Sequence, residues 1–129
     1  MTRTLARATA FAALLSGLGV LPAFADTGIM THDTAMGAVL TDAKGMTLYT
    51  FDSDKDGASA CYDVCAQNWP PVMAAAGAKA EGEYGLSERK DGGMQWTYKG
   101  MPLYTWVKDA KPGDTTGDGV KGVWHAAKP

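Results

Sequence analysis

The pattern of apolar and polar residues predicts a series of short β-strands rather than long helices. Runs rich in β-branched and aromatic side chains occur at residues 39–41, 46–51, 86–90, 94–98, 101–107 and 119–125. Turn-forming residues at 42–45 and at 91–93 separate neighbouring runs, and each therefore predicts a β-hairpin. Lys99-Gly100 predicts a further tight turn into the run that follows it.

One segment between the runs has the composition of a short helical turn. Residues 59–67 contain no Gly or Pro, and Ser59 is a candidate N-cap. Pro70-Pro71 prevents the helix from continuing. The connector at residues 73–85 is rich in Ala and Gly and predicts no regular element.

Strand alternation places the aromatic side chains of one run on a common face. Successive strand residues point to opposite faces, so Tyr49 and Phe51 share one face while Leu48 and Thr50 share the other. We expect the aromatic face to pack inward, because large aromatic side chains contribute heavily to small cores.

The chain contains an internal repeat. Residues 45–54 read GMTLYTFDSD, and residues 100–109 read GMPLYTWVKD. The two segments are offset by 55 residues. The same offset relates three further identical pairs: Lys44 and Lys99, Asp63 and Asp118, and Trp69 and Trp124. We therefore predict two related units at about 37–72 and 93–127. The fold class is mostly β: a small single domain of two related β-hairpin-containing units with one short helical turn.

Each copy carries the pattern Y-x-[FWY]-x-x-D. Its residues are Tyr49, Phe51 and Asp54 in the first copy and Tyr104, Trp106 and Asp109 in the second. Four other motifs accompany it: Cys61-x-x-x-Cys65, Asn68-Trp69-Pro70-Pro71, Trp96-Thr97-Tyr98 and Gly122-Val123-Trp124-His125. Together they resemble the bacterial family called secreted repeat of unknown function, also described as predicted lipoproteins with a Yx(FWY)xxD motif. The resemblance covers nearly the whole mature chain, and it implies export but no particular activity.

The first residues have the plan of a secretory signal peptide. Arg3 and Arg7 precede the apolar run 10–21, and Ala23-Phe24-Ala25 forms an A-x-A cleavage site. We therefore predict a signal peptide at residues 1–25. The apolar run is short for a membrane span, which needs about 20 residues.

The signal peptide also sets the expected compartment and the bounds of the mature domain. Many members of the family are lipid-anchored, but no cysteine lies near the predicted cleavage site. We expect a non-lipidated exported form, periplasmic or secreted and monomeric, with no membrane span after cleavage. Residues 26–36 should form a flexible mature N-terminus, and residues 37–129 should form a single β-rich domain with the internal repeats.

The charge balance argues against a nucleic-acid partner. The chain has 14 Asp and Glu against 12 Lys and Arg, and loss of the signal peptide would remove Arg3 and Arg7. Phosphate contacts need clustered basic side chains, and the sequence has no such cluster.

An acidic stretch after the first repeated strand resembles the start of a calcium-binding loop. Asp52, Asp54 and Asp56 are followed by Gly57, and Asp63 stands at the twelfth position of such a loop. The usual bidentate Glu is replaced by Asp at that position, and only Asp54 is repeated, as Asp109. We therefore favour a solvated acidic turn, in which Asp54 binds backbone N–H groups, over a calcium site.

The two cysteines have a spacing that is typical of neither thioredoxin-like enzymes nor haem attachment. Cys61 and Cys65 are separated by three residues, which lies within disulfide reach on a helical turn. In an exported chain we expect them to form a structural disulfide. A redox-active pair is the alternative, because short-range disulfides can be reduced more easily.

Soft ligands near the mature N-terminus form a candidate copper site. Met30, His32 and Met36 lie close together, and thioether and imidazole groups suit copper. Met46 and Met101 occupy equivalent repeat positions, which favours a packing role for them.

The aromatic residues have two possible roles. They could fill the core, which we favour, or form a platform for a glycan, a peptide or a quinone-like ring. The residues concerned are Tyr49, Phe51, Trp69, Trp96, Tyr98, Tyr104, Trp106 and Trp124.

The function that we favour is binding rather than catalysis. The sequence contains no G-x-S-x-G, H-E-x-x-H, P-loop or G-x-G-x-x-G template, so we expect no enzyme. We predict an exported non-enzymatic module of the cell envelope that binds an unknown envelope protein or a small ligand, with no resident cofactor. The alternative is a periplasmic metal-handling protein, for copper or calcium, or a redox accessory protein.

Overall fold

The computed structural model describes residues 27–129, so the predicted signal peptide at 1–25 lies outside the described residues. Within this described part of the chain strands dominate, with one short α-helix and one 3₁₀ turn, and this confirms the mostly β fold. The elements are β1 (Met30–Thr34), β2 (Gly37–Thr41), β3 (Tyr49–Phe51), α2 (Val64–Asn68), β4 (Met73–Ala74), β5 (Tyr84–Glu88), β6 (Met94–Tyr98), β7 (Met101–Pro102), η3 (Val120–Gly122) and β8 (Trp124–Ala126).

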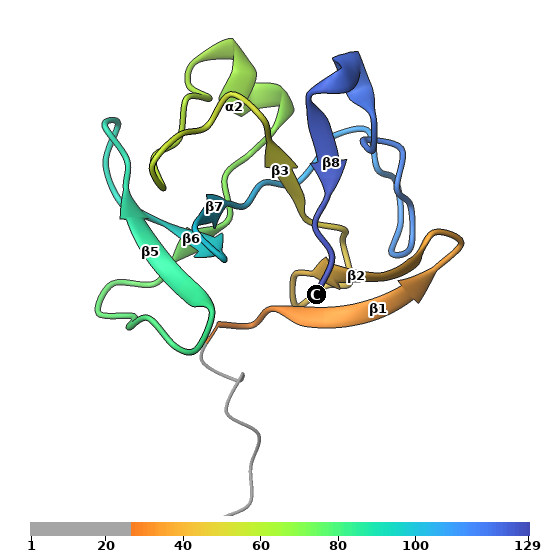
Figure 1. Cartoon of the computed structure of the whole chain (residues 1–129), viewed down its shortest axis with the longest axis horizontal. Coiled ribbons are helices and arrows are strands. Elements are labelled where there is room, and N and C mark those ends of the chain that lie inside the picture. The colour runs from red at the N-terminus through yellow and green to blue at the C-terminus, as the bar shows by residue number, and fades with distance from the viewer. Residues whose placement is uncertain (1–26) are drawn as a thin grey trace, which may run out of the picture.

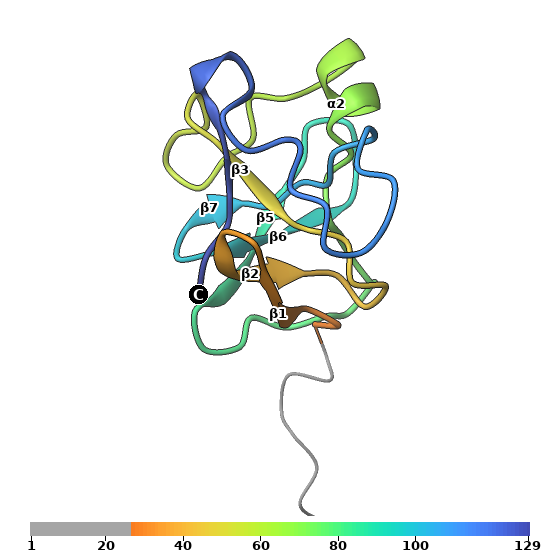
Figure 2. The same cartoon turned by 90° about the vertical axis from the view of Figure 1, so that its right-hand side faces the viewer.

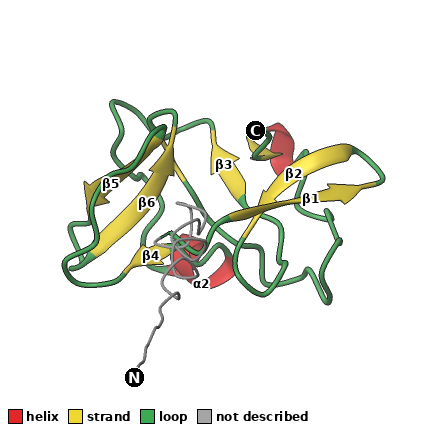
Figure 3. Ribbon diagram, turned by 90° about the horizontal axis from the view of Figure 1, so that it is seen from below, coloured by secondary structure: helices red, strands yellow, loops and turns green. Residues whose placement is uncertain are grey.

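The strands form three small antiparallel groups. β1 pairs with β2, β3 pairs with β8, and β6 lies between β4 and β5 while also pairing with β7. In Figures 1 and 3, β3 lies between the β1–β2 hairpin on one side and the β5–β6 hairpin on the other. The two hairpins are equivalent elements, because the offset between the repeats relates β1 to β5.

The hairpin predicted around residues 91–93 is confirmed. β5 and β6 pair over their full lengths, from Tyr84 opposite Tyr98 to Glu88 opposite Met94. Gly92 and Gly93 both have positive φ, which a turn this tight requires.

The hairpin predicted around residues 42–45 is only partly formed. Asp42 Oδ1 accepts bonds from the Lys44 and Met46 N–H groups, so the chain reverses as predicted. Pairing then stops after a bridge between Thr41 and Thr47 and one bond from Leu48 N to the Leu40 oxygen. β3 does not continue the pairing with β2, because β2 pairs with β1 and β3 pairs with β8.

The prediction of a flexible terminus at residues 26–36 is wrong for its central part. Residues 30–34 form β1, and every one of them is paired with a residue of β2. Most of this strand is exposed, so no apolar alternation marks it in the sequence. Backbone pairing and the turn at Thr34, whose hydroxyl donates to the Gly37 oxygen at 2.9 Å, hold it in place.

The predicted helical turn is shorter than expected. The helix begins at Val64, and Ser59 does not cap it. The Ser59 hydroxyl instead lies 2.6 Å from the Tyr104 hydroxyl. Asp63 stands at the cap position with φ of 53° and makes no side-chain capping bond.

Both repeated strands contribute buried side chains to two core clusters. The leucine cluster contains Ile29, Leu40, Leu48, Trp96, Leu103 and Ala127. The aromatic cluster contains Val39, Tyr49, Cys61, Trp69, Tyr104, Trp124 and Ala126. The tyrosines of both copies are fully buried, which confirms that this face packs inward, but the leucines on the opposite face are buried as well. Each repeated strand therefore lies between the two clusters.

Candidate functional site

The two copies of the motif meet directly along their backbones. Tyr49 N–H donates to the Tyr104 oxygen at 2.8 Å, and Tyr104 N–H donates to the Tyr49 oxygen at 3.0 Å. Such a reciprocal pair is the hydrogen-bonded pair of an antiparallel ladder. The centre of the molecule is thus a pair of equivalent residues, one from each repeat.

Each tyrosine hydroxyl reaches the aspartate of the other copy. Tyr49 Oη donates to Asp109 Oδ2 at 2.7 Å, and Tyr104 Oη donates to Asp54 Oδ2 at 2.7 Å. All four residues are buried, with the aspartates 6 % and 7 % exposed. The Tyr and Asp of one Y-x-[FWY]-x-x-D motif therefore do not bind each other: the motif works by exchange between the copies.

The second oxygen of each aspartate holds the following loop. Asp54 Oδ1 accepts the Ala60 N–H at 2.7 Å, and Asp109 Oδ1 accepts both the N–H and the hydroxyl of Thr116, at 3.0 and 2.6 Å. Asp54 therefore binds a backbone N–H group and fixes a turn, as expected, but the prediction of a solvated turn is wrong for this residue, because Asp54 is buried. What the sequence did not indicate is the bond to the opposite tyrosine.

Burial determines the ionisation of this centre. Desolvation raises the pKa of Tyr49, and the hydrogen bond to Asp109 raises it further. Desolvation also raises the pKa of Tyr104, with a further increase from its bond to Asp54. The pKa of Asp54 is raised by burial, although the Tyr104 and Ala60 bonds and the positive charge of Arg89 oppose this shift. Both tyrosines therefore stay protonated donors over the ordinary pH range.

A buried arginine supports one of the two exchanged bonds. Arg89 is 4 % exposed and donates to Ser59 Oγ at 3.2 Å, Gln95 Oε1 at 2.8 Å and the Cys61 oxygen at 3.0 Å. Because the Tyr104 hydroxyl donates to Asp54, the Ser59 hydroxyl donates to Tyr104. Sequence reasoning missed this network, since Arg89 stands among charged residues at the end of a strand and nothing there marks it as buried.

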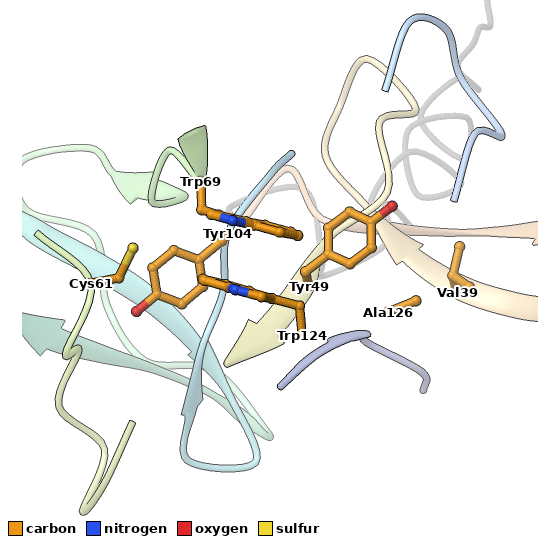
Figure 4. Packing of buried hydrophobic residues seen from close by; sticks show 7 residues of the cluster. All are labelled: Val39, Tyr49, Cys61, Trp69, Tyr104, Trp124 and Ala126. Carbon is orange, nitrogen blue, oxygen red and sulfur yellow. The ribbon is translucent and has the colours of Figure 1, made fainter. Parts of the chain in front are cut away.

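Four aromatic rings form a continuous stack beside the exchanged bonds. Their order is Phe51, Trp124, Trp69 and Trp106, and we call this set the ring stack. Neighbouring centroids lie 4.1, 3.8 and 3.9 Å apart, with interplanar angles of 9°, 1° and 24°. Figure 4 shows the two inner indoles lying parallel, with Tyr49 and Tyr104 on either side. The rings alternate between the two copies, so neither copy forms the stack alone.

A cleft with a volume of about 420 Å³ opens over the ring stack. All four stacked rings line this ring-stack cleft, together with Val64, Cys65 and Asn68 of α2 on one side and Val120, Lys121 and Val123 on the other. Ser53 completes the lining. Figures 1 and 2 both place α2 and the turn before β8 at the same end of the molecule. The two walls occupy equivalent positions in the two repeats.

The predicted disulfide is confirmed. Cys61 and Cys65 are bonded, with their Cα atoms 5.2 Å apart. Cys61 is fully buried in the aromatic cluster, whereas Cys65 lies in α2 and in the wall of the cleft. The disulfide therefore ties α2 to the core beneath it.

The four aspartates proposed for calcium are not brought together. Asp54 is buried, and both of its oxygens accept hydrogen bonds. Asp52 is exposed and lies 2.9 Å from His125 Nε2. Asp56 and Asp63 are exposed and both have positive φ. Between residues 27 and 129 no three His, Cys, Asp or Glu side chains are grouped so that they could hold a metal ion.

The residues proposed for copper lie on and beside β1. Met30 and His32 are two residues apart on this strand and therefore point to the same side of it. Met36 lies in the turn after β1 and packs against the aromatic cluster. The three residues therefore lie in one hairpin, but Met36 is partly buried against the core.

The fold and this centre define a class of internally duplicated β domain, in which two copies of one motif exchange tyrosine–aspartate bonds. The chain belongs to the family described as secreted repeat of unknown function, whose model matches it twice, at residues 30–73 and 85–128. The protein is therefore an exported one. Each matched segment begins earlier than the unit predicted from the sequence and takes in β1 or most of β5.

The other comparisons add no relative. Neither the search of curated proteins nor the search of solved structures gave a significant match. In the described part of the chain, no helix is both long and apolar enough to cross a membrane.

Proposed function

We propose that this exported protein is a non-enzymatic binding module of the cell envelope and that the ring-stack cleft is its binding site. The observation that carries the proposal is the cleft over four stacked rings. Its volume of about 420 Å³ falls within the range of small-molecule sites, which is roughly 300–1,000 Å³. Its lining of aromatic and aliphatic side chains with a few polar groups is also typical of such sites.

The rim of the cleft supports the same proposal. Val64 is 66 % exposed and stands on α2 at the edge of the cleft. The outer rings of the stack, Phe51 and Trp106, are only partly buried. Aromatic side chains are enriched at binding surfaces because they bring large contact area at little loss of conformational freedom.

Native mass spectrometry tests this proposal directly. The protein would be purified without denaturation from its own exported compartment, and any bound small molecule would appear as added mass. Val64→Glu places a charge at the cleft edge on an exposed position, so it should abolish the added mass without unfolding the protein. Val107→Glu is the matched control, because Val107 is also exposed, at 51 %, but does not line the cleft.

A second assay uses a neutral dye that fluoresces in apolar sites, such as Nile red. The unmodified protein and Val107→Glu should enhance its emission to the same extent, and Val64→Glu should not. Dye binding and added mass that both survive Val64→Glu would place the binding site elsewhere. No added mass and no dye binding with the unmodified protein would refute the proposed function.

One observation favours a redox accessory role as a second candidate. Cys65 lines the cleft, so a molecule bound there could contact one sulfur of the disulfide. A reduction potential below about −300 mV would assign the disulfide a structural role only. A distinctly higher potential would favour the redox role.

A further inference from the structure

The two inner rings of the stack carry buried hydrogen-bond donors that the protein leaves unpaired. Trp69 and Trp124 are 5 % and 3 % exposed, and both line the ring-stack cleft. No hydrogen bond joins either indole N–H group to an acceptor among residues 27–129; the rings pack against one another, against Tyr49 and Tyr104, and against apolar side chains of the aromatic cluster. Figure 4 shows the two nitrogen atoms at the same edge of the stack. A buried N–H without an acceptor is rare and costly, so this pair points to an acceptor supplied from outside.

The only charged residue in the lining of the cleft is a lysine. Lys121 stands on the η3 wall and forms no ion pair within residues 27–129. The chain as a whole has a net charge of −2, so this positive site stands out against an acidic protein. One unpaired cation in the lining of the same cleft as two N–H donors complements an acceptor that carries a single negative charge.

The apolar side chains in the lining indicate the chemistry of the uncharged part of the ligand. Val64, Val120 and Val123 give the two walls an apolar surface, which favours a planar or aliphatic body over a sugar. We propose that the ring-stack cleft binds a small organic monocarboxylate. Its carboxylate accepts bonds from the N–H groups of Trp69 and Trp124 and faces Lys121, and its apolar body lies between the valines. This inference rests on the proposed function and names the ligand class for the same cleft.

Indole ¹H–¹⁵N resonances give a direct readout. The full exported protein would be labelled with ¹⁵N and titrated with phenylacetate or with phenylacetamide, which has the same shape and no charge. Phenylacetate should move the indole N–H peaks of Trp69 and Trp124 downfield and saturate. The peak of Trp96 is the internal control, because that ring lies in the leucine cluster and should stay in place. Phenylacetamide should bind at least fivefold more weakly.

Lysine variants test the charge separately from the fold. Lys121→Gln should weaken phenylacetate binding at least fivefold and leave phenylacetamide binding unchanged. Lys79→Gln makes the same charge change at an exposed position outside the cleft and should change neither. Equal affinity for the two probes, or no effect of Lys121→Gln, would overturn the carboxylate inference while binding in the cleft stands.

The outcomes separate this inference from the proposed function. If neither probe moves the Trp69 and Trp124 peaks at tens of millimolar, but Nile red binds and Val64→Glu abolishes it, only the carboxylate inference is overturned. If no probe, dye or retained small molecule binds, both are overturned.

Discussion

Tyr104→Phe would remove the hydroxyl that reaches from the second copy of the motif to the buried carboxylate of the first. That hydroxyl donates to Asp54 Oδ2 at 2.7 Å, and it also receives the bond of Ser59. Hydrogen bonds to charged groups contribute about 1.5–3 kcal/mol, so we expect Tyr104→Phe to cost about 2 kcal/mol of unfolding free energy. Tyr49→Phe should cost a similar amount, because it leaves Asp109 Oδ2 without its donor at 2.7 Å.

A double-mutant cycle separates this bond from the general cost of each substitution. The cycle combines Tyr104→Phe with Asp54→Ala, and urea unfolding gives the free energy of each variant. The crosswise pairs Tyr104–Asp54 and Tyr49–Asp109 should each show a coupling energy of about 1.5–3 kcal/mol.

The pairs within one motif serve as the matched control. The side chains of Tyr49 and Asp54 share no hydrogen-bond partner. The Tyr49 hydroxyl binds Asp109 and the Gly117 N–H, while the Asp54 carboxylate binds the Tyr104 hydroxyl and the Ala60 N–H. Their coupling should stay within about 0.5 kcal/mol, and the same holds for Tyr104 with Asp109. Coupling within a motif that equals or exceeds the crosswise coupling would refute the exchange of bonds between the copies.

Three further predictions concern the rest of the buried network. Because the folded state raises the pKa of Tyr49 and Tyr104, their contribution to stability is complete below pH 10 and is lost as pH rises above it. Urea unfolding should therefore show the free energy of unfolding falling by about 1.4 kcal/mol per pH unit for each tyrosine, and each Tyr→Phe variant should reduce that slope. Replacement of Cys61 and Cys65 by Ser should lower the free energy of unfolding by only about 2 kcal/mol, because the disulfide closes a short loop. If urea unfolding gives a loss twice as large, the disulfide does more than restrict the unfolded chain. Arg89→Met should lower the free energy of unfolding by about 3 kcal/mol and the thermal midpoint by roughly 15 °C, because Ser59, Gln95 and the Cys61 oxygen lose their donor. A calorimetric midpoint equal to that of the unmodified protein would contradict this prediction.

The local elements were predictable from the sequence to the extent that local chemistry determines them. The turn at 91–93 and the strands on either side follow from glycine and from β-branched and aromatic residues, and the disulfide follows from its spacing in an exported chain. β1 was not predictable, because its residues are mostly exposed and show no apolar alternation. Its pairing with β2 depends on the backbone, which the side-chain pattern does not report.

The site was less predictable than the fold. The repeated Tyr and Asp could be recognised as a frame, and the role of Asp54 in a turn followed from its position after a strand. Which Tyr meets which Asp depends on how the two copies pack, and periodicity along one strand says nothing about contacts between distant strands. The burial of Arg89 depends on the same packing. The neighbouring Asp91 also binds its guanidinium, but the buried acceptors come from Ser59, Cys61 and Gln95 of β6.

The duplication itself explains where a binding site can arise in so small a domain. The ring stack alternates between copies, so the floor of the cleft exists only where both copies meet, and it is built from equivalent positions. The walls are also equivalent in position but differ in residue: the offset between the repeats relates Cys65 to Val120 and Asn68 to Val123. Lys121 has the uncharged Ala66 as its counterpart. The two copies therefore share the residues that join them and differ at the residues that form the walls of the cleft, which is the division expected if the exchanged bonds hold the fold and the cleft provides the proposed specificity.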